Sequence, residues 1–209
     1  LQARLLLDRG LATEQDLAEV VARSRRNALA NPHAQLSGEI TADELLQAPT
    51  YVAPLRRTDC CPVSDGAAAM IIATVEKARE WGVPHAVIRG IDHRIESHNL
   101  GVRDLTDSVS TRLAAQASGL GAGPVDVAEL HAPFSHQEII LSRALGLDGE
   151  TSVNPSGGVL SGNVMMAAGL CRVGEVFKRI VSGEAERGVA HATAGPCLQQ
   201  NLVTVLERA

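Results

Sequence analysis

The sequence predicts an α/β fold in which layers of helices pack on a buried sheet. From residue 67 onward, short apolar runs alternate with segments that have helical spacing, and this alternation is typical of α/β proteins. Aromatic residues make up only 2% of the 209 residues, and small residues such as alanine, valine and glycine are frequent. Such small side chains favour close packing of helices on a sheet. The first fifty residues precede this alternation and show no strand pattern.

Residues 1–50 carry two helix-start signals. The tetrapeptides T-E-Q-D at 13–16 and T-A-D-E at 41–44 each place a threonine three residues before a carboxylate, which is the pattern of a capping box. Leu17, Val20 and Val21 form one apolar face after the first box. Prolines at 32 and 49 end the two expected helices. We therefore expect a helical segment beside the sheet.

The middle of the chain predicts two strands and two helices. Ala67–Ala73 is a continuous run of small apolar residues, which predicts a strand buried on both faces. The helix expected near residue 110 turns Val109, Leu113 and Ala117 inward, and residues 121–124 form a boundary. This helix is expected over Ser108–Ser118. The other expected elements are a helix over Val75–Trp81 and a strand over Ala86–Ile91.

The remaining residues repeat the alternation. A buried strand leads into a helix that Ser135 and Glu138 cap and Gly146 ends. A glycine-rich loop at 154–162 then leads into a long helix that starts at Asn163. The expected elements are strands Val125–Leu130, Gly188–Thr193 and Leu202–Leu206 and helices Ser135–Leu145 and Asn163–Val181.

Composition and charge exclude several classes of protein. A net charge of −5 argues against a nucleic-acid or polybasic membrane-surface role. No apolar stretch is long enough to span a membrane, and the start lacks a secretory signal and a methionine, so the chain is expected to begin inside a longer gene product. The four cysteines suggest no disulfide framework and the seven histidines no metal site, which favours a cytoplasmic protein.

Three residue patterns point to chemistry. The glycine-rich loop runs into a helix start, where backbone N–H groups can stabilise a developing negative charge. His131 stands at a strand end, where it either exchanges a proton near neutral pH or is a partly buried histidine bonded to a backbone carbonyl. Asn163 either donates its amide to an oxyanion or caps the long helix.

Four segments resemble the thiolase superfamily, in its sterol-carrier-type and lipid-transfer branch. Residues 154–169 are similar to the family's N-x-x-G-G-x-x-x-x-G-H-P-x-G loop, with Asn163 at the histidine position. Residues 60–69 look like its C-C-P-x-S-D-G-A-A-A run, and residues 129–134 resemble its E-x-H-D-x-F motif. Residues 25–35 resemble its loop domain.

The resemblance implies a thiolase fold, with layers in the order α-β-α-β-α and two similar halves. It implies that residues 1–50 are a remnant of the loop domain, that 51–123 are the end of the first half with a connecting helix, and that 124–209 are the complete second half. The half carrying the nucleophilic cysteine would precede Leu1. A partner chain, a dimer or a longer protein is therefore expected, because the strands of the first half would have unpaired edges.

The resemblance also implies a set of site residues. His131 is expected to act as acid or base and Asn163 as an oxyanion donor. The family closes with C-x-G-G-G-x-G, whose cysteine is an acid/base, and counted from the preceding strand that position falls on Thr193. The glycine cluster is missing here, and Cys197 takes the cysteine's role only if the loop rearranges. Residues expected near the coenzyme A arm are Gly157, Gly158, Gly162 and Phe134, and candidate phosphate contacts are Arg25, Arg26, His33 and Lys77.

Three functions are compatible with the sequence. The first is C–C bond cleavage or formation on a lipid or steroid acyl-CoA without thiolysis, for example a retro-aldol reaction, as in thiolase-like steroid side-chain aldolases. The second is a true acyl-CoA thiolase whose cysteine lies upstream or on another chain, and the third is a non-catalytic acyl-CoA-binding subunit. In each, coenzyme A thioester is the substrate or ligand, no cofactor is tightly bound, and a homodimer or hetero-oligomer is expected. A small OB-fold protein with a zinc ribbon is a further expected partner.

Overall fold

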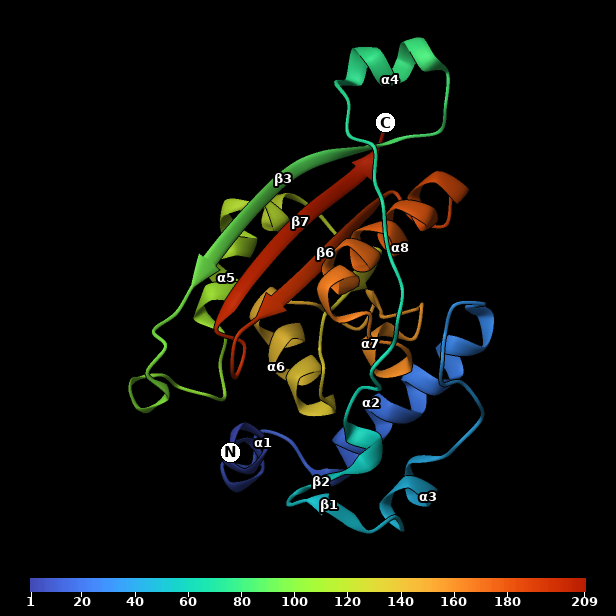
Figure 1. Cartoon of the computed structure of the whole chain (residues 1–209). Helices are drawn as coiled ribbons and strands as arrows, with labels where there is room; N and C mark the ends of the chain where they lie inside the picture. Colours follow the sequence, from blue (N-terminus) through green and yellow to red (C-terminus); the bar gives the residue numbers. More distant parts are fainter.

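The computed structural model describes all residues, 1–209, and a five-stranded mixed sheet forms its centre (Figure 1). The order of strands across the sheet is β3-β7-β6-β4-β5. β4 pairs in parallel with β5 and β6, whereas β7 pairs antiparallel with β6 and β3. The bounds are β3 Ala86–Ile95, β4 Val127–Glu129, β5 Ser152–Val153, β6 Arg187–Ala194 and β7 Gln200–Arg208.

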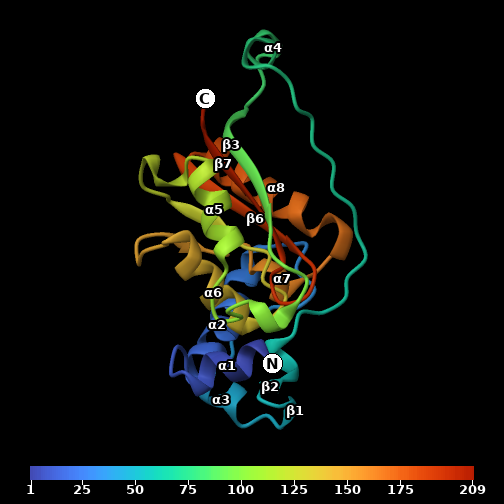
Figure 2. The same cartoon turned by 90° about the vertical axis from the view of Figure 1, so that its left-hand side faces the viewer.

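Helices cover both faces of this sheet (Figure 2). α5 (Val109–Ala117) and α6 (Ser135–Leu145) lie on one face, and α8 (Ala168–Ser182) lies on the other. Alternating strand residues supply the two apolar layers: Val189, Val203 and Val205 pack toward α6, while Ala190 and Leu206 pack with Val176 and Ile180 of α8. The predicted α/β class and layered packing are thus confirmed.

The N-terminal segment is helical, as expected. It contains α1 (Gln2–Asp8), α2 (Glu14–Asn27) and α3 (Ala42–Leu46), and both predicted capping boxes are present, at Thr13 and Thr41. The predicted apolar face of α2 is buried. Sequence patterns missed α1 and the small hairpin of β1 (Thr50–Val52) and β2 (Leu55–Arg56). None of the helices in the chain is long and apolar enough to cross a bilayer.

The prediction of a buried strand over Ala67–Ala73 is wrong for this chain. Between β2 and α4 (Val75–Trp81), residues 61–74 run extended along the outside of the body without pairing to any strand (Figure 2). Their apolar side chains are exposed, with Ile71 at 86% and Ile72 at 74%. A strand requires a neighbour for its N–H and C=O groups, and residues 65–73 have no hydrogen-bond partner in this chain. α4 ends at Gly82 as predicted and projects from the body with no buried residue.

Three predictions about helices also need correction. α5 buries Ser110, Thr111, Ala114 and Ala115, while all three residues of the predicted inward face, Val109, Leu113 and Ala117, are exposed. The inward face is therefore rotated from the predicted one, because the short side chains pack on the sheet and Ser110 reaches Glu96.

The long helix begins at Ala168 rather than at Asn163, after the single turn α7 (Gly158–Ser161) and a 3₁₀ turn over Met165–Ala167. Ala167 is its N-cap, so Asn163 does not cap it. Ser135 likewise does not cap α6 but is its first residue, and its hydroxyl donates to Asp59 at 2.6 Å.

Candidate functional site

His131 lies two residues beyond the end of β4, and β6 fixes both its backbone and its ring. Its N–H donates to the carbonyl of His191 at 3.2 Å, and the Thr193 N–H donates to its Nδ1 at 3.4 Å. No protein group binds Nε2. Burial, and then the positive charge of Arg172, lower the pKa of His131 to about 4. The ring is therefore neutral at pH 7, with its proton on Nε2 because Nδ1 accepts a hydrogen bond.

A buried ion pair stands beside His131. Glu129, on the same face of the strand, pairs with Arg172 of α8, and both side chains are almost fully buried. Ser156 completes the cluster: its N–H donates to Oε1 of Glu129 at 2.9 Å, and its hydroxyl lies 2.8 Å from both Glu129 Oε2 and Arg172 Nη1. The pair thus joins β4, the glycine-rich loop and α8.

Three amides of the glycine-rich loop are used inside the protein. Besides Ser156, the Gly157 N–H donates to Asn154 O at 2.9 Å and the Gly158 N–H to Ser156 Oγ at 3.2 Å. The N–H groups of Ser156, Gly157 and Gly158 are therefore not free to stabilise an anion in this arrangement. Gly157 is required for packing instead, because its φ is +91° and a Cβ there would lie 2.6 Å from Ser161 Oγ.

Side chains of α2 and the turn that follows it hold the carbonyls of the same loop. Ser24 donates to Gly157 O at 2.5 Å, and Asn27 donates to Asn154 O at 3.0 Å. Asn31 donates to Ser156 O at 2.9 Å. Their spacing along the chain is helical (24, 27, 31), a signal that sequence reading did not use. The predicted loop-domain segment thus orients the glycine-rich loop.

Asn154 is a further residue that the sequence reading missed. Its Oδ1 accepts the N–H of Leu130 at 2.7 Å, directly before His131, and its Nδ2 donates to Glu138 at 2.5 Å. Glu138 also pairs with Arg23 of α2. Asn154 has a φ of +49°, a conformation that asparagine tolerates better than most residues. It therefore connects the loop to the strand that carries His131.

Asn163 lies between α7 and the 3₁₀ turn, and its amide points at a thiol. Nδ2 donates to Sγ of Cys61 at 3.2 Å, while Oδ1 is buried without a partner. Burial raises the pKa of the Cys61 thiol. Cys61 N–H in turn donates to Pro133 O at 2.9 Å. Asn163 is thus connected through Cys61 to the loop that follows His131.

The other predicted site residues are spread around this centre. Phe134 bridges to Cys60 and stacks on His136 with ring centroids 5.7 Å apart. Gly162 packs beside Gln35 and Ser64. Cys197 lies in the β6–β7 hairpin, where Arg103 binds its carbonyl at 2.5 Å. Thr193, and not Cys197, is the residue of this hairpin that contacts the ring of His131.

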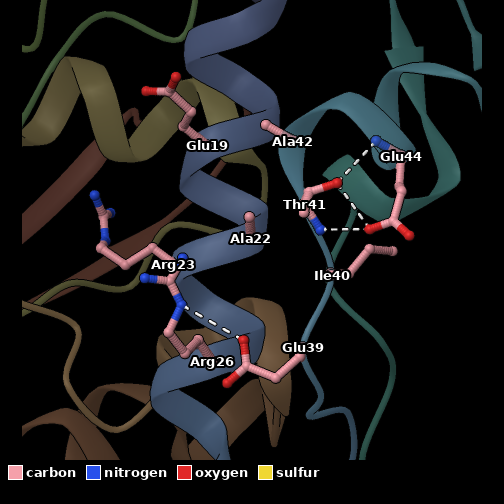
Figure 3. A pocket seen from close by; sticks show the side chains of 9 residues that line it. All are labelled: Glu19, Ala22, Arg23, Arg26, Glu39, Ile40, Thr41, Ala42 and Glu44. Carbon is pink, nitrogen blue, oxygen red and sulfur yellow. Dashed lines mark hydrogen bonds and ion pairs between the residues drawn. The ribbon is translucent and has the colours of Figure 1, made fainter.

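The candidate phosphate contacts do not converge. Arg25 donates to Leu160 O, and Lys77 on the projecting α4 pairs with Glu80. Arg26 lines a pocket of about 670 Å³ between α2 and residues 39–44 (Figure 3). Three carboxylates, of Glu19, Glu39 and Glu44, oppose two guanidinium groups there, so the pocket does not favour an anion.

A larger cavity, of about 720 Å³, separates the extended segment from α8. It is lined by residues 63–70, by the turn at 31–35, by Gly158–Gly162 and by one side of α8 that includes Arg172. One wall therefore includes residues 65–70, whose backbone has no hydrogen-bond partner in this chain. No group of three or more His, Cys, Asp or Glu side chains is placed to hold a metal ion.

Comparison with known proteins gave related sequences, although no family model matches the chain. The benzoylsuccinyl-CoA thiolase subunit BbsB of Thauera aromatica is 28% identical over 91% of this chain and 57% of its own length. An acetyl-CoA acetyltransferase of Methanothermobacter thermautotrophicus is 31% identical over 88% and 56%. Sterol carrier protein 2 of Rattus norvegicus is 26% identical over 90% and 39%. The chain spans about half the length of the relatives it matches, or less.

Solved structures confirm the fold over the whole chain. The Ltp2-ChsH2(DUF35) aldolase superposes with a TM-score of 0.83 at 21% sequence identity, covering 99% of this chain and 61% of the other. This similarity confirms that the arrangement of sheet and helices described above is the one the resemblance implied.

Proposed function

Since the chain belongs to the thiolase superfamily, we propose that it forms part of an enzyme acting on acyl-CoA thioesters, with the thioester oxygen bound at His131. The observation that supports this is the state of the His131 ring. Thr193 occupies Nδ1, and no protein group occupies Nε2. A neutral imidazole in this tautomer donates a hydrogen bond from Nε2, which is what a developing enolate oxygen requires.

His131 is better suited to donate than to act as a base. A general base works best with a pKa near the operating pH, and a pKa of about 4 lies well below it. Asn163 remains a proposed second donor, which requires its amide to turn from Cys61 toward the substrate. The buried, unpartnered Oδ1 shows that the present orientation leaves one of its polar atoms unsatisfied.

Among reactions on such a thioester, we favour retro-aldol cleavage of a β-hydroxyacyl-CoA. A base removes the hydroxyl proton, the Cα–Cβ bond breaks to give a carbonyl product and an enolate, and the enolate is protonated at Cα. This reaction needs oxyanion donors but no cysteine nucleophile or histidine at position 163. One alternative is acyl transfer, which requires a nucleophilic cysteine from outside residues 1–209. The other alternative is that the chain is a non-catalytic subunit that binds acyl-CoA.

The partner that this function requires is proposed to cover the cavity between residues 63–70 and α8. The unpaired backbone of 65–73 and the exposed Ile71 and Ile72 form a surface suited to strand addition. The remaining half of a thiolase fold, on a longer chain or a partner chain, supplies such a strand. The Ltp2-ChsH2(DUF35) aldolase is an assembly of two proteins, which supports an additional small partner of the OB-fold and zinc-ribbon kind.

Calorimetry on the complete assembly tests the proposal. An acyl-CoA ester and a β-hydroxyacyl-CoA should bind, and His131→Ala should weaken both while leaving the assembly intact by light scattering. Equal affinities of the unsubstituted assembly and the His131→Ala assembly for these ligands would mean that His131 does not contact the thioester.

A further inference from the structure

The β6–β7 hairpin loop, residues 195–199, has a strained backbone. Cys197 and Leu198 have φ values of +54° and +58°. The left-handed conformation is unfavourable for a residue other than glycine. Two such residues in succession persist only where their surroundings hold them. The loop is therefore held in place by contacts rather than by its own preferences.

Arg103 and Asn201 supply these contacts. The guanidinium of Arg103, almost fully buried, donates to Pro196 O at 3.2 Å and to Cys197 O at 2.5 Å. Asn201 Nδ2 donates to Leu198 O at 2.8 Å. Three successive carbonyls of the strained loop are thus bound by two side chains.

The two side chains belong to one buried polar network. Asn201 is completely buried, accepts from His191 Nε2 at 2.9 Å and donates to Ser110 Oγ at 2.7 Å. Ser110 donates to Glu96 at 2.6 Å, and Glu96 pairs with Arg103 at 3.4 Å. The contacts form a closed ring from the loop through α5 and the end of β3 back to the loop. None of these residues has a role in the chemistry proposed above.

The network ends at His131. Asn201 lies opposite Thr193 in the β6–β7 register, and Thr193 is the residue whose N–H reaches His131 Nδ1. His191, bound by Asn201, offers the carbonyl that accepts the His131 N–H. A shift of the hairpin would therefore move both contacts of His131 at once.

We propose that Asn201 and Arg103 are positioning residues that hold the β6–β7 hairpin so that Thr193 fixes the Nε2–H tautomer of His131. The proposal deepens the proposed role of His131 and rests on it. The tautomer of a histidine ring is set by the partner of its other nitrogen. Without the hydrogen bonds from Arg103 and Asn201, the loop relaxes toward ordinary φ values and the Thr193 N–H leaves Nδ1 of His131. Both tautomers of His131 then become populated.

Nitrogen NMR of the histidine rings in the ¹⁵N-histidine-labelled, unliganded full chain tests this proposal, with His131→Gln used for assignment. The unsubstituted protein should show His131 in the Nε2–H form. In Arg103→Met and Asn201→Ala the Nδ1–H form should rise by roughly threefold or more, because the tautomer follows the hydrogen bond at the other nitrogen. Asn201→Asp keeps an acceptor for His191 and removes the donors to Leu198 and Ser110, so it tests the two donor contacts separately from the contact with His191.

Arg4→Met and Asn99→Ala are matched controls at exposed positions whose side chains contact only nearby residues, and they should leave the tautomer unchanged. Circular dichroism selects the variants that fold. A single Nε2–H form of His131 in folded Arg103→Met and Asn201→Asp would overturn the proposal. Because the measurement needs no ligand, failure of acyl-CoA to bind would refute the proposed function and leave this result standing.

Discussion

Arg172 of α8 forms a buried ion pair with Glu129 of β4, which lies two residues before His131. The side chains are 6% and 0% exposed. Removing one partner of a buried pair leaves an uncompensated charge, which costs roughly 3–5 kcal/mol. Arg172→Met should therefore lower the free energy of unfolding by about that amount, measured by urea denaturation. Arg94→Met, which removes an exposed pair with Asp92, should cost about 1 kcal/mol or less. Equal losses of unfolding free energy in the two variants would contradict the prediction that the buried pair contributes more than the exposed one.

The same substitution should change the titration of His131. The positive charge of Arg172 contributes to lowering its pKa, so the pKa of His131 in Arg172→Met should rise from about 4 toward its usual value near 6.5. Histidine NMR across pH 3–8 measures this. If the pKa of His131 stayed near 4 in this variant, burial alone would account for the lowered pKa.

Stability should fall in mild acid. Burial lowers the pKa of His131 and His136 to about 4 and that of His191 to about 3. In the unfolded chain these rings titrate near 6.5, so below that pH the unfolded state binds protons that the folded state does not. The free energy of unfolding should therefore decrease as pH falls from 6.5 to 4, by up to about 3 kcal/mol for each ring. Urea midpoints measure this, and constant midpoints between pH 7 and 4.5 would be the contrary result.

Gly157→Ala should destabilise the glycine-rich loop. The residue has a φ of +91°, and an added Cβ would lie 2.7 Å from Ala28 Cβ. Left-handed backbone and steric overlap together should cost roughly 2–4 kcal/mol. Gly149→Ala is the matched control, since nothing lies within 4 Å of its added Cβ and its φ is not in the left-handed region. Thermal unfolding of the two variants should separate them clearly.

The extended segment should make the isolated chain associate. Ile71 and Ile72 are exposed beside nine residues of unpaired backbone, a combination that favours strand addition between chains. We expect oligomers by light scattering, and fewer of them in the double variant Ile71→Lys, Ile72→Lys. Leu29→Lys, at an exposed apolar residue elsewhere, should change little. A monodisperse monomer of the unsubstituted chain would argue against the partner surface proposed above.

His131→Ala should reduce turnover of the complete assembly by roughly 10²–10³-fold, as expected for loss of an oxyanion donor. Retained turnover with lower stability would assign His131 a structural role. Asn163→His is the companion variant. It should not create thiolase activity unless the assembly supplies a cysteine nucleophile.

The sequence alone determined the elements whose signals are local. Thr13 and Thr41 cap their helices through residues three positions away, and Gly82 and Gly146 end helices in the left-handed conformation. These interactions lie within a few residues along the chain, so their patterns can be read directly. The apolar runs of β3, β4, β6 and β7 likewise predicted the central sheet.

Only the tertiary structure decided how the site is arranged. Ala67–Ala73 has the composition of a strand but no neighbour in this chain, and strand formation depends on a partner for each backbone group. Asn163 precedes a helix in the sequence, yet its amide meets Cys61, which lies 102 positions away. The glycine-rich loop has the pattern of an anion site, but its Ser156 amide donates to Glu129 and its Gly157 and Gly158 amides donate within the loop. Thr193, and not Cys197, reaches the His131 ring, because the pairing of β6 with β7 places Thr193 opposite Asn201 near the end of β6.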